Sequence, residues 1–335
     1  MNNREELISI IAELIENEKA KGTDIKCLDK NHAPIIAQII SNYKLSYPNK
    51  DGQDKMQADM LFVGAPTGAG KDTLVRKIML DNDSKKFVVL NMDMFRYYYY
   101  EISQNQNRIL DKDFAITTNQ ISYELYYIIQ EIILREFPGT NIIITGTIKD
   151  LEWVKQIVSR YKNDTQTEYN TSLITLAVPE RESAISIYER YLNLVDSRDD
   201  TNSPLRYTEL KYHTDTVKDF ISNVQYFEEN LKNNDERNLF DSIRVYRRSI
   251  DMFDLSEDTI IYDSEKTNGS ESAISVINSI MYNNREIDRK RVNLILDIVN
   301  RNKDYLKSQG LYEKILNDLK VIIPKIDIDF DEPEL

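Results

Sequence analysis

The chain has 335 residues, of which 41% are hydrophobic, and its formal net charge is −13; this fits a globular protein with one large domain and appendages, or with two small domains. The negative charge argues against binding to nucleic acid, which needs many lysines and arginines. One cysteine, Cys27, excludes an internal disulfide, and two histidines are too few for a zinc cluster.

The first 58 residues are predicted to form a helical extension and a linker. Apolar residues recur at helical spacing over residues 5–19 and again over residues 34–45, where Pro34 suits a first helical turn. Polar residues 46–58 connect these helices to the next domain. The two helices either pack on the flank of that domain or form a built-in lid or inhibitor over its site.

The N-terminal residues also bear on the compartment. Residues 4–13 place charged side chains among apolar ones, which a secretory signal does not, and no apolar run in the chain approaches the length of a membrane span. We therefore expect a cytoplasmic protein that does not enter a membrane.

Residues 60–80 carry the strongest functional pattern. A short apolar run is followed by a glycine-rich turn and then by apolar residues at helical spacing. This order of strand, loop and helix is typical of a phosphate-binding loop, in which backbone N–H groups and a lysine hold nucleotide phosphates. The predicted ATP-binding residues are Ala65, Pro66, Thr67, Gly68, Ala69, Gly70, Lys71, Asp72 and Thr73.

Both ends of this motif depart from the usual pattern of Gly, four residues and Gly-Lys-Ser/Thr. Ala65 stands at the first glycine and Asp72 at the Ser/Thr, although Gly64 lies one residue early and Thr73 one residue late. A glycine-rich surface loop with a solvated lysine is the alternative interpretation.

Further short apolar runs predict strands after this loop, with helical patterns between them. Each run is continuous rather than alternating, as expected of strands that are covered on both faces. Alternation of strands and helices predicts an α/β fold with a mostly parallel sheet, whose ligands bind at the carboxyl ends of the strands. The strands are expected at 87–91, 141–145, 172–178 and 243–246, and the helices at 121–133, 151–161, 184–194 and 217–231.

The C-terminal part is predicted to be helical. A last strand is expected at 259–262, followed by helices at 273–280, 292–299 and 311–319 and an acidic tail at 327–335. The expected domains are a helical N-terminal extension with linker at 1–58, a nucleotide-binding domain at 59–268 and a helical C-terminal extension at 269–335.

Three residues are candidates for chemistry. Asp93 follows the second strand by two positions, where a base can accept the proton of a hydroxyl that attacks a phosphate; a helix N-cap is the competing interpretation. Arg190 and Arg206 either neutralise charge on a transferred phosphoryl group or are ordinary solvated arginines. Two further groups each allow two interpretations. The tyrosines at 97–100 either stack on a base or are buried in the core. The arginines at 247–248 either contact a nucleotide or lie on the surface.

In combination and in order, these segments resemble the zeta toxin family, P-loop kinases of bacterial toxin–antitoxin modules that phosphorylate UDP-N-acetylglucosamine. The resemblance covers about residues 61–263 and implies a P-loop kinase-like three-layer α/β fold with helical extensions at both ends. The segments that carry it are GAPTGAGKDT, NMDMFR, TGT, AVP with IYERY, LRYTELKYH, IRVY and IIYDS.

The resemblance implies an ATP- and Mg²⁺-dependent kinase of a sugar nucleotide. Lys71 would hold the phosphates of ATP, Asp93 would deprotonate a sugar hydroxyl, and Arg190 and Arg206 would stabilise the phosphoryl group. An antitoxin is the implied partner, unless the N-terminal helices serve that purpose within the chain. The implied substrate-binding residues are Glu124, Thr147 and Phe95.

Two departures from the family concern magnesium. The third strand ends in Thr145-Gly146-Thr147 where the family has Glu-Gly-Thr, and Asp72 replaces the Ser/Thr of the loop. We infer an exchange in which Asp72 and Thr145 are the metal ligands, so that the same two ligand types remain. The alternatives are a kinase of another nucleotide or small alcohol, and an inert nucleotide-binding protein that acts through partners.

Overall fold

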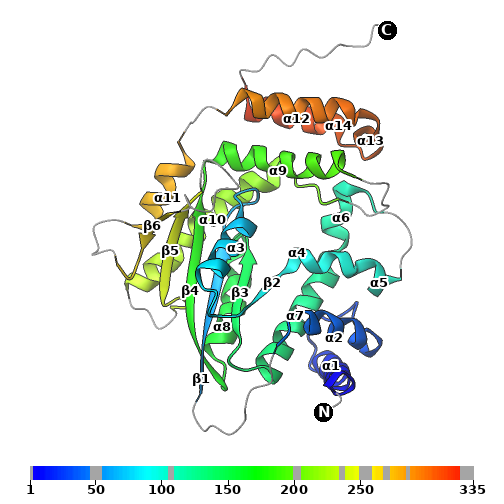
Figure 1. Cartoon of the computed structure of the whole chain (residues 1–335), viewed down its shortest axis with the longest axis vertical. Coiled ribbons are helices and arrows are strands. Elements are labelled where there is room, and N and C mark those ends of the chain that lie inside the picture. Colours follow the sequence, from blue (N-terminus) through cyan, green and yellow to red (C-terminus); the bar gives the residue numbers. More distant parts are fainter. Residues whose placement is uncertain are drawn as a thin grey trace.

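The computed structural model describes residues 3–45, 55–104, 109–198, 205–233, 238–248, 259–266, 272–283 and 287–324. Within these residues the centre is a six-stranded sheet in the order β2-β3-β1-β4-β5-β6 (Figure 1). Strands β1 to β5 are parallel, and β6 is antiparallel to β5, so the predicted mostly parallel sheet is confirmed. The strands are β1 (Met56–Gly64), β2 (Phe87–Asn91), β3 (Asn141–Gly146), β4 (Thr167–Ala177), β5 (Ser242–Arg247) and β6 (Thr259–Asp263).

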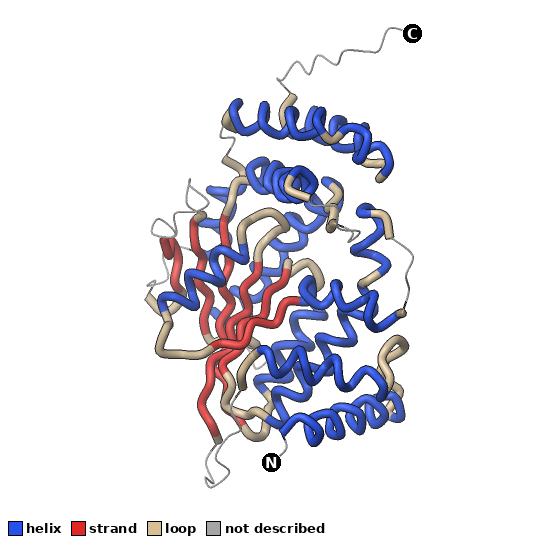
Figure 2. The backbone as a smooth tube through the Cα atoms, turned by 45° about the vertical axis from the view of Figure 1, so that its right-hand side comes forward, coloured by secondary structure: helices blue, strands red, loops and turns tan. Residues whose placement is uncertain are grey.

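Helices cover both faces of the sheet, as Figures 1 and 2 show. Successive residues of β1 point to opposite faces: Phe62 belongs to the larger core, whereas Val63 packs with Leu74 of α3. The predicted three-layer α/β fold is therefore confirmed. One face carries α3 (Lys71–Asp81), and the larger core contains apolar residues of α7 (Asn119–Glu136), α8 (Leu151–Lys162), α10 (Leu210–Lys232) and α11 (Ala273–Met281).

The N-terminal extension is part of the larger core. Helices α1 (Asn3–Ala20) and α2 (Ala33–Asn42), with the short helix η1 (Lys30–His32) between them, pack against α7. Their apolar side chains, such as Ile11 and Ile36, are fully buried in the same cluster as the sheet. The two predicted helices are thus present. Residues 46–54 of the predicted linker lie outside the described residues. Strand β1 begins at Met56, so the linker ends before the predicted boundary at residue 58.

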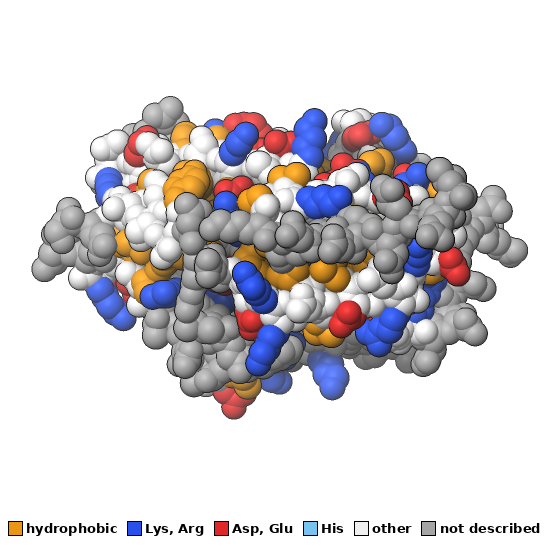
Figure 3. Space-filling model, turned by 90° about the horizontal axis from the view of Figure 1, so that it is seen from above, with side chains coloured by type: hydrophobic (Ala, Val, Ile, Leu, Met, Phe, Trp, Pro, Cys, Tyr) orange, Lys and Arg blue, Asp and Glu red, His pale blue; other side chains and the backbone are white. Residues whose placement is uncertain are grey.

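The C-terminal helices divide into two groups by their packing. Helix α11 belongs to the core of the sheet, whereas α12 (Arg289–Arg301), α13 (Lys303–Ser308) and α14 (Tyr312–Ile322) form a second core with α9 (Glu180–Asp196). Seen from above, the face over these helices carries basic and acidic side chains interspersed (Figure 3). Buried apolar residues of the group, such as Ile295 and Ile315, pack in one core with Tyr188 of α9. The predicted acidic tail lies outside the described residues.

Several short elements were not predicted. They are η1, α4 (Met92–Phe95), η2 (Arg96–Tyr98), α5 (Tyr99–Ser103), α6 (Asp111–Thr117) and α13. Strand β4 also begins at Thr167, earlier than the predicted start at residue 172. None of the described helices is long and apolar enough to cross a membrane.

Candidate active site

The loop between β1 and α3 has the conformation of a phosphate cradle. Gly68 (φ +81°) and Gly70 (φ +98°) are left-handed, a conformation that glycine adopts without strain. A Cβ on Gly68 would lie 2.1 Å from the carbonyl oxygen of Ser183 at the start of α9, so glycine is also required by the close packing. Gly70 is the N-cap of α3 and offers no capping side chain, so the positive end of the helix faces the cavity beside it.

Lys71 lies back over this loop. Its Nζ donates hydrogen bonds to the carbonyl oxygens of Ala65 (3.0 Å) and Pro66 (3.3 Å). Burial lowers the pKa of Lys71 to about 8; nearby Asp72 and Asp93 oppose this shift. The Lys71 ammonium group thus donates to neutral carbonyl oxygens in this structure. The charged oxygens of a phosphate would accept these hydrogen bonds more strongly.

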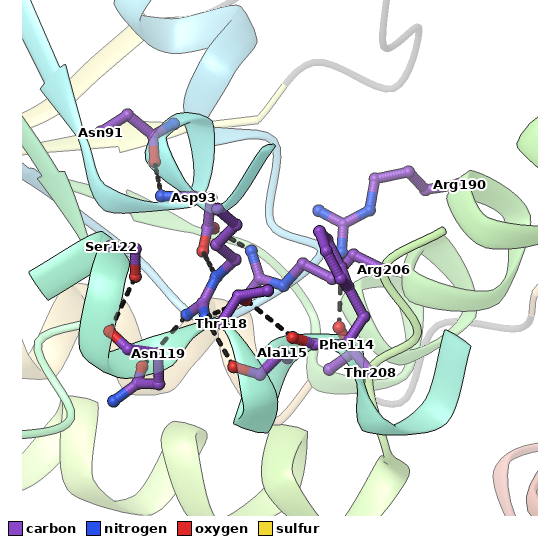
Figure 4. Close-up of polar contacts among 11 residues, drawn as sticks. Asn91, Asp93, Phe114, Ala115, Thr118, Asn119, Ser122, Arg190, Arg206 and Thr208 are labelled. Atoms are coloured by element: carbon purple, nitrogen blue, oxygen red, sulfur yellow. Dashed lines mark hydrogen bonds and ion pairs between the residues drawn. The ribbon is translucent and has the colours of Figure 1, made fainter. Parts of the chain in front are cut away.

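Asp93 is an ion-pair partner rather than a helix cap. The N-cap of α4 is Asn91, whose Oδ1 accepts a hydrogen bond from the Asp93 N–H (2.9 Å). The Asp93 carboxylate accepts from Nε of Arg96 (3.0 Å) and from Nη1 of Arg206 (Figure 4). Burial works against its charge, but Arg206 and Arg96 outweigh that effect and hold the pKa of Asp93 below its usual range.

Arg96 fixes Asp93 against two further helices. It is 7% exposed, and its guanidinium donates to the Ala115 carbonyl oxygen (2.6 Å), to Thr118 Oγ1 (3.2 Å) and to Asn119 Oδ1 (3.3 Å). Sequence reasoning did not select Arg96. Its position three residues after Asp93, one helical turn away, could have indicated it.

The two predicted arginines reach the same cavity from different elements. Arg190 projects from α9, and its Nη2 donates to Thr208 Oγ1 (3.4 Å). Burial and the neighbouring Arg206 lower the pKa of Arg190. Arg206 lies in the loop before α10, and its Nε is buried without a hydrogen-bond partner. Figure 4 shows both guanidinium groups on the same side of Asp93.

A cavity of about 420 Å³ collects these groups at the carboxyl ends of the strands. Five of its lining residues are cations and two are carboxylates, in a chain whose net charge is −13. This local excess of positive charge suits a polyanionic ligand such as a nucleoside triphosphate. The charged lining residues are Lys71, Arg96, Arg190, Arg206, Arg248, Asp72 and Asp93.

Arg248 and Thr67 extend the phosphate side of this cavity. Arg248, which directly follows β5, donates from Nη1 to the Gly68 carbonyl oxygen and to Ser186 Oγ, both at 3.3 Å. Of its two interpretations, contact with the nucleotide site is therefore the one that its position supports. Thr67 is 4% exposed, and its Oγ1 has no hydrogen-bond partner. An unpartnered hydroxyl in a glycine-rich cradle is what a phosphate or its metal ion would satisfy.

The predicted metal ligands also line the cavity. The register of the sheet places Thr145 beside Asn91, and the Ala65 N–H donates to the Gly146 carbonyl oxygen (3.3 Å), which holds the end of β3 against the loop. Asp72 is exposed at the first turn of α3. Within the described residues no group of three or more acidic, histidine or cysteine side chains could hold a metal alone. The residues fit Mg²⁺ bound mainly through phosphate oxygens, as is usual for nucleotide sites.

Of the three predicted substrate-binding residues, the structure brings only Thr147 to the cavity. Phe95 is 2% exposed and packs in the larger hydrophobic core. Glu124 is fully buried, and its two carboxylate oxygens accept hydrogen bonds from the backbone N–H groups of residues 26–28 at 2.8 to 3.1 Å. Packing therefore directs Phe95 and Glu124 away from the cavity, contrary to the expectation.

The N-terminal helices are not a lid in this structure. No described residue before Thr67 lines the cavity. The segment between α1 and α2 is held to α7 by Glu124, and His32 Nε2 lies 3.2 Å from the carbonyl oxygen of Ile102 in α5. Of the two interpretations left open by the sequence, packing on the flank is the one observed.

The fold and the site together define a P-loop kinase-like protein. A model of the family described as zeta toxin matches residues 47–267, which is more than half of the chain. The chain therefore belongs to the zeta toxin family, and the resemblance inferred from its motifs is confirmed. Membership of this family and the kinase-like fold support a phosphotransferase that uses a nucleotide.

One solved structure shows the same fold. The chain is similar to a structure of the PezAT chromosomal toxin–antitoxin system of the human pathogen Streptococcus pneumoniae, with 18% identity and a TM-score of 0.58 over 83% of this chain and 98% of that chain. A weaker similarity, with 11% identity and a TM-score of 0.46, links it to the AvrRxo1-ORF1:AvrRxo1-ORF2 complex over 94% of this chain and 84% of that chain. No curated protein matches the chain.

Proposed function

We propose that the protein is an ATP-dependent kinase that transfers the γ-phosphoryl group to a hydroxyl of a UDP-amino sugar such as UDP-N-acetylglucosamine. The observation that supports this most directly is the shared cavity, in which a carboxylate, Asp93, lies with the glycine loop, Lys71 and two arginines. A phosphate cradle alone would suit any nucleotide-binding protein. A carboxylate in the same cavity is what transfer to a hydroxyl requires in addition.

Each side chain has a defined role in this reaction. The loop N–H groups and Lys71 bind the triphosphate, and Asp72 and Thr145 would hold Mg²⁺, which neutralises phosphate charge when bound. The acceptor hydroxyl, oriented by Thr147, attacks the γ-phosphorus. A new P–O bond forms, the bond to the β-phosphate oxygen breaks, and the hydroxyl proton passes to Asp93. Arg190 and Arg206 stabilise the charge on the transferred group.

Two other activities fit parts of the site. The acceptor is another nucleotide or a small alcohol if the pocket does not accept a UDP-sugar, because the fold does not determine it. The replacement of the usual strand-end glutamate by Thr145 favours an inert nucleotide-binding protein that acts through its partners. The Asp93 carboxylate and its ion pairs with Arg206 and Arg96 count against a protein without transfer activity.

We also propose an antitoxin as partner and a cytoplasmic site of action. The similar Streptococcus pneumoniae structure belongs to a toxin–antitoxin system. Expression of this chain alone would then inhibit bacterial growth, and Asp93→Asn would relieve the inhibition. A built-in antitoxin at the N-terminus has less support, because α1 and α2 lie in the core away from the cavity.

The test is a transfer assay with purified protein, Mg²⁺, γ-labelled ATP and a panel of UDP-sugars, nucleotides and small alcohols. We expect a labelled UDP-amino sugar, and a loss of about 100-fold or more in Asp93→Asn, because proton transfer to a base contributes that much. The matched control is Asp297→Asn, since Asp297 is exposed on α12. ATP binding without a labelled product from any acceptor would support the inert binder instead.

A further inference from the structure

Asp111, the first residue of α6, is a fully buried carboxylate that the proposed reaction does not use. Oδ2 accepts hydrogen bonds from the hydroxyls of Tyr191 (2.8 Å) and Tyr305 (2.6 Å), and Oδ1 accepts from the N–H of Leu205 (2.9 Å). Its own N–H donates to Oε1 of Gln309 (3.1 Å). A buried carboxylate is tolerated only with such partners, so these contacts constrain each other closely.

The partners of Asp111 stand next to both arginines of the site. Leu205 directly precedes Arg206, and Tyr191 directly follows Arg190. One carboxylate therefore joins the loop that carries one arginine to the helix that carries the other. The same helix α6 contributes Phe114 to the cavity and the Ala115 carbonyl oxygen to Arg96.

The third partner comes from the C-terminal helices, beyond the residues that match the family model. Tyr305 of α13 donates to Asp111 and accepts a hydrogen bond from Arg198, which polarises its hydroxyl. Helix α14 reinforces the same loop. Asp318 accepts from the Tyr207 hydroxyl (3.4 Å), and Lys314 pairs with Glu209.

We propose that Asp111 is a positioning residue that sets Arg190 and Arg206 relative to Asp93, and that the C-terminal helices complete the site through Tyr305. This inference rests on the proposed phosphoryl transfer. Asp111 does not line the cavity and acts through the two arginines. The C-terminal helices accordingly support catalysis as well as covering α9.

The first test is kinetic. Asp111→Asn keeps the shape but removes the charge, and Tyr305→Phe removes one donor; we expect kcat to fall about tenfold or more in Asp111→Asn and less in Tyr305→Phe. The KM for ATP should change less than about twofold, because the glycine loop and Lys71 are untouched. The matched control is Asp113→Asn, exposed two residues further along α6. Wild-type kcat in both Asp111→Asn and Tyr305→Phe would overturn the proposal.

A double-mutant cycle separates positioning from general stability. If Asp111 acts through the two arginines, Asp111→Asn should lower kcat by a smaller factor in an Arg206→Ala background than in the wild type, because only Arg190 is then left for it to position. A full multiplicative loss in that background would contradict the proposal.

Hydrogen exchange provides a readout that needs no activity. The amide of Leu205 should exchange faster in Asp111→Ala, which removes the acceptor oxygen, than in the wild type or in Asp113→Ala. If the wild type transfers phosphate to no acceptor, the proposed function fails. The exchange rate of the Leu205 amide then still tests whether Asp111 holds the Leu205 loop. Unchanged exchange at Leu205 would exclude this contact.

Discussion

Asp93 and Arg206 lie 113 positions apart in the chain and form an ion pair inside the cavity. Arg96 binds the other oxygen of the same carboxylate. The base of the proposed reaction is therefore held by one of the arginines that would face the phosphoryl group. Binding of the triphosphate would compete with Asp93 for Arg206.

The first prediction concerns the acid dependence of stability. Arg206 and Arg96 hold the pKa of Asp93 low against the opposing effect of burial. The pair thus stabilises the fold above the unfolded carboxyl pKa of about 4, and this contribution is lost as the pH falls. Asp93→Asn should lower the free energy of unfolding near neutral pH by about 1 kcal/mol, since the Asp93 side chain is 42% exposed. Urea unfolding of both proteins from neutral to acidic pH measures the difference, which must shrink on acidification; a growing difference would contradict the prediction.

The second prediction concerns Lys71, whose burial lowers its pKa to about 8. Between this value and the unfolded pKa of about 10, the unfolded chain binds more protons, so the free energy of unfolding rises with pH. Lys71→Met should be more stable than the wild type near neutral pH and lose this advantage as the pH approaches about 10.

The same pKa predicts a proton uptake. ATP phosphates restore the charge of Lys71, so binding at about pH 8.5 should take up protons. Calorimetry of ATP binding in two buffers with different ionisation enthalpies measures this uptake. Lys71→Met is the control, and equal enthalpies for the wild type in both buffers would count against a lysine–phosphate contact.

The third prediction concerns the proposed exchange of magnesium ligands between Asp72 and Thr145. Asp72→Ala should reduce Mg²⁺-dependent transfer by about 100-fold or more, because charge neutralisation at phosphate contributes several kcal/mol. Combining Asp72→Thr with Thr145→Glu recreates the family pattern and should retain activity, whereas Asp72→Thr alone should not. Binding of Mn²⁺ in the presence of a non-hydrolysable ATP analogue provides a second measurement. A fully active Asp72→Ala protein rules out the exchange.

The fourth prediction concerns Glu124. Its carboxylate accepts hydrogen bonds from three consecutive backbone N–H groups, so Glu124→Gln should lower the free energy of unfolding by about 2 kcal/mol and leave the KM of the acceptor unchanged. Thermal unfolding and steady-state kinetics measure both effects, with the exposed Glu13→Gln as control. A raised acceptor KM with unchanged stability would instead restore Glu124 as a substrate-binding residue.

Much of the fold follows from local sequence patterns. The continuous apolar runs predict the strands, because parallel strands are buried on both faces, and the residue order around Lys71 predicts the phosphate loop. The direction of β6 does not follow from its few apolar residues. The connection from Arg247 to Thr259 is too short for a crossover helix, which is the property that could have indicated an antiparallel strand.

The site was predictable where a residue's position depends on its own strand. Asp93 and Thr147 follow strand ends, and both line the cavity. The environments of Glu124 and Asp111 could not be predicted, because they are built by segments about 80 to 200 positions away in the chain. A short helix such as α6 has too few turns for a hydrophobic period, so its role emerges only from tertiary contacts.

The close approach of Gly68 to the Ser183 carbonyl has a mechanical consequence. The glycine loop packs so closely on the helix that bears Arg190 that no Cβ fits between them, and His213 contacts the Ser183 hydroxyl of that helix at 2.9 Å. Tilting α9 cannot draw Arg190 toward the loop without displacing the loop itself. Arg190 and the glycine loop would therefore move together as one unit if the site closed.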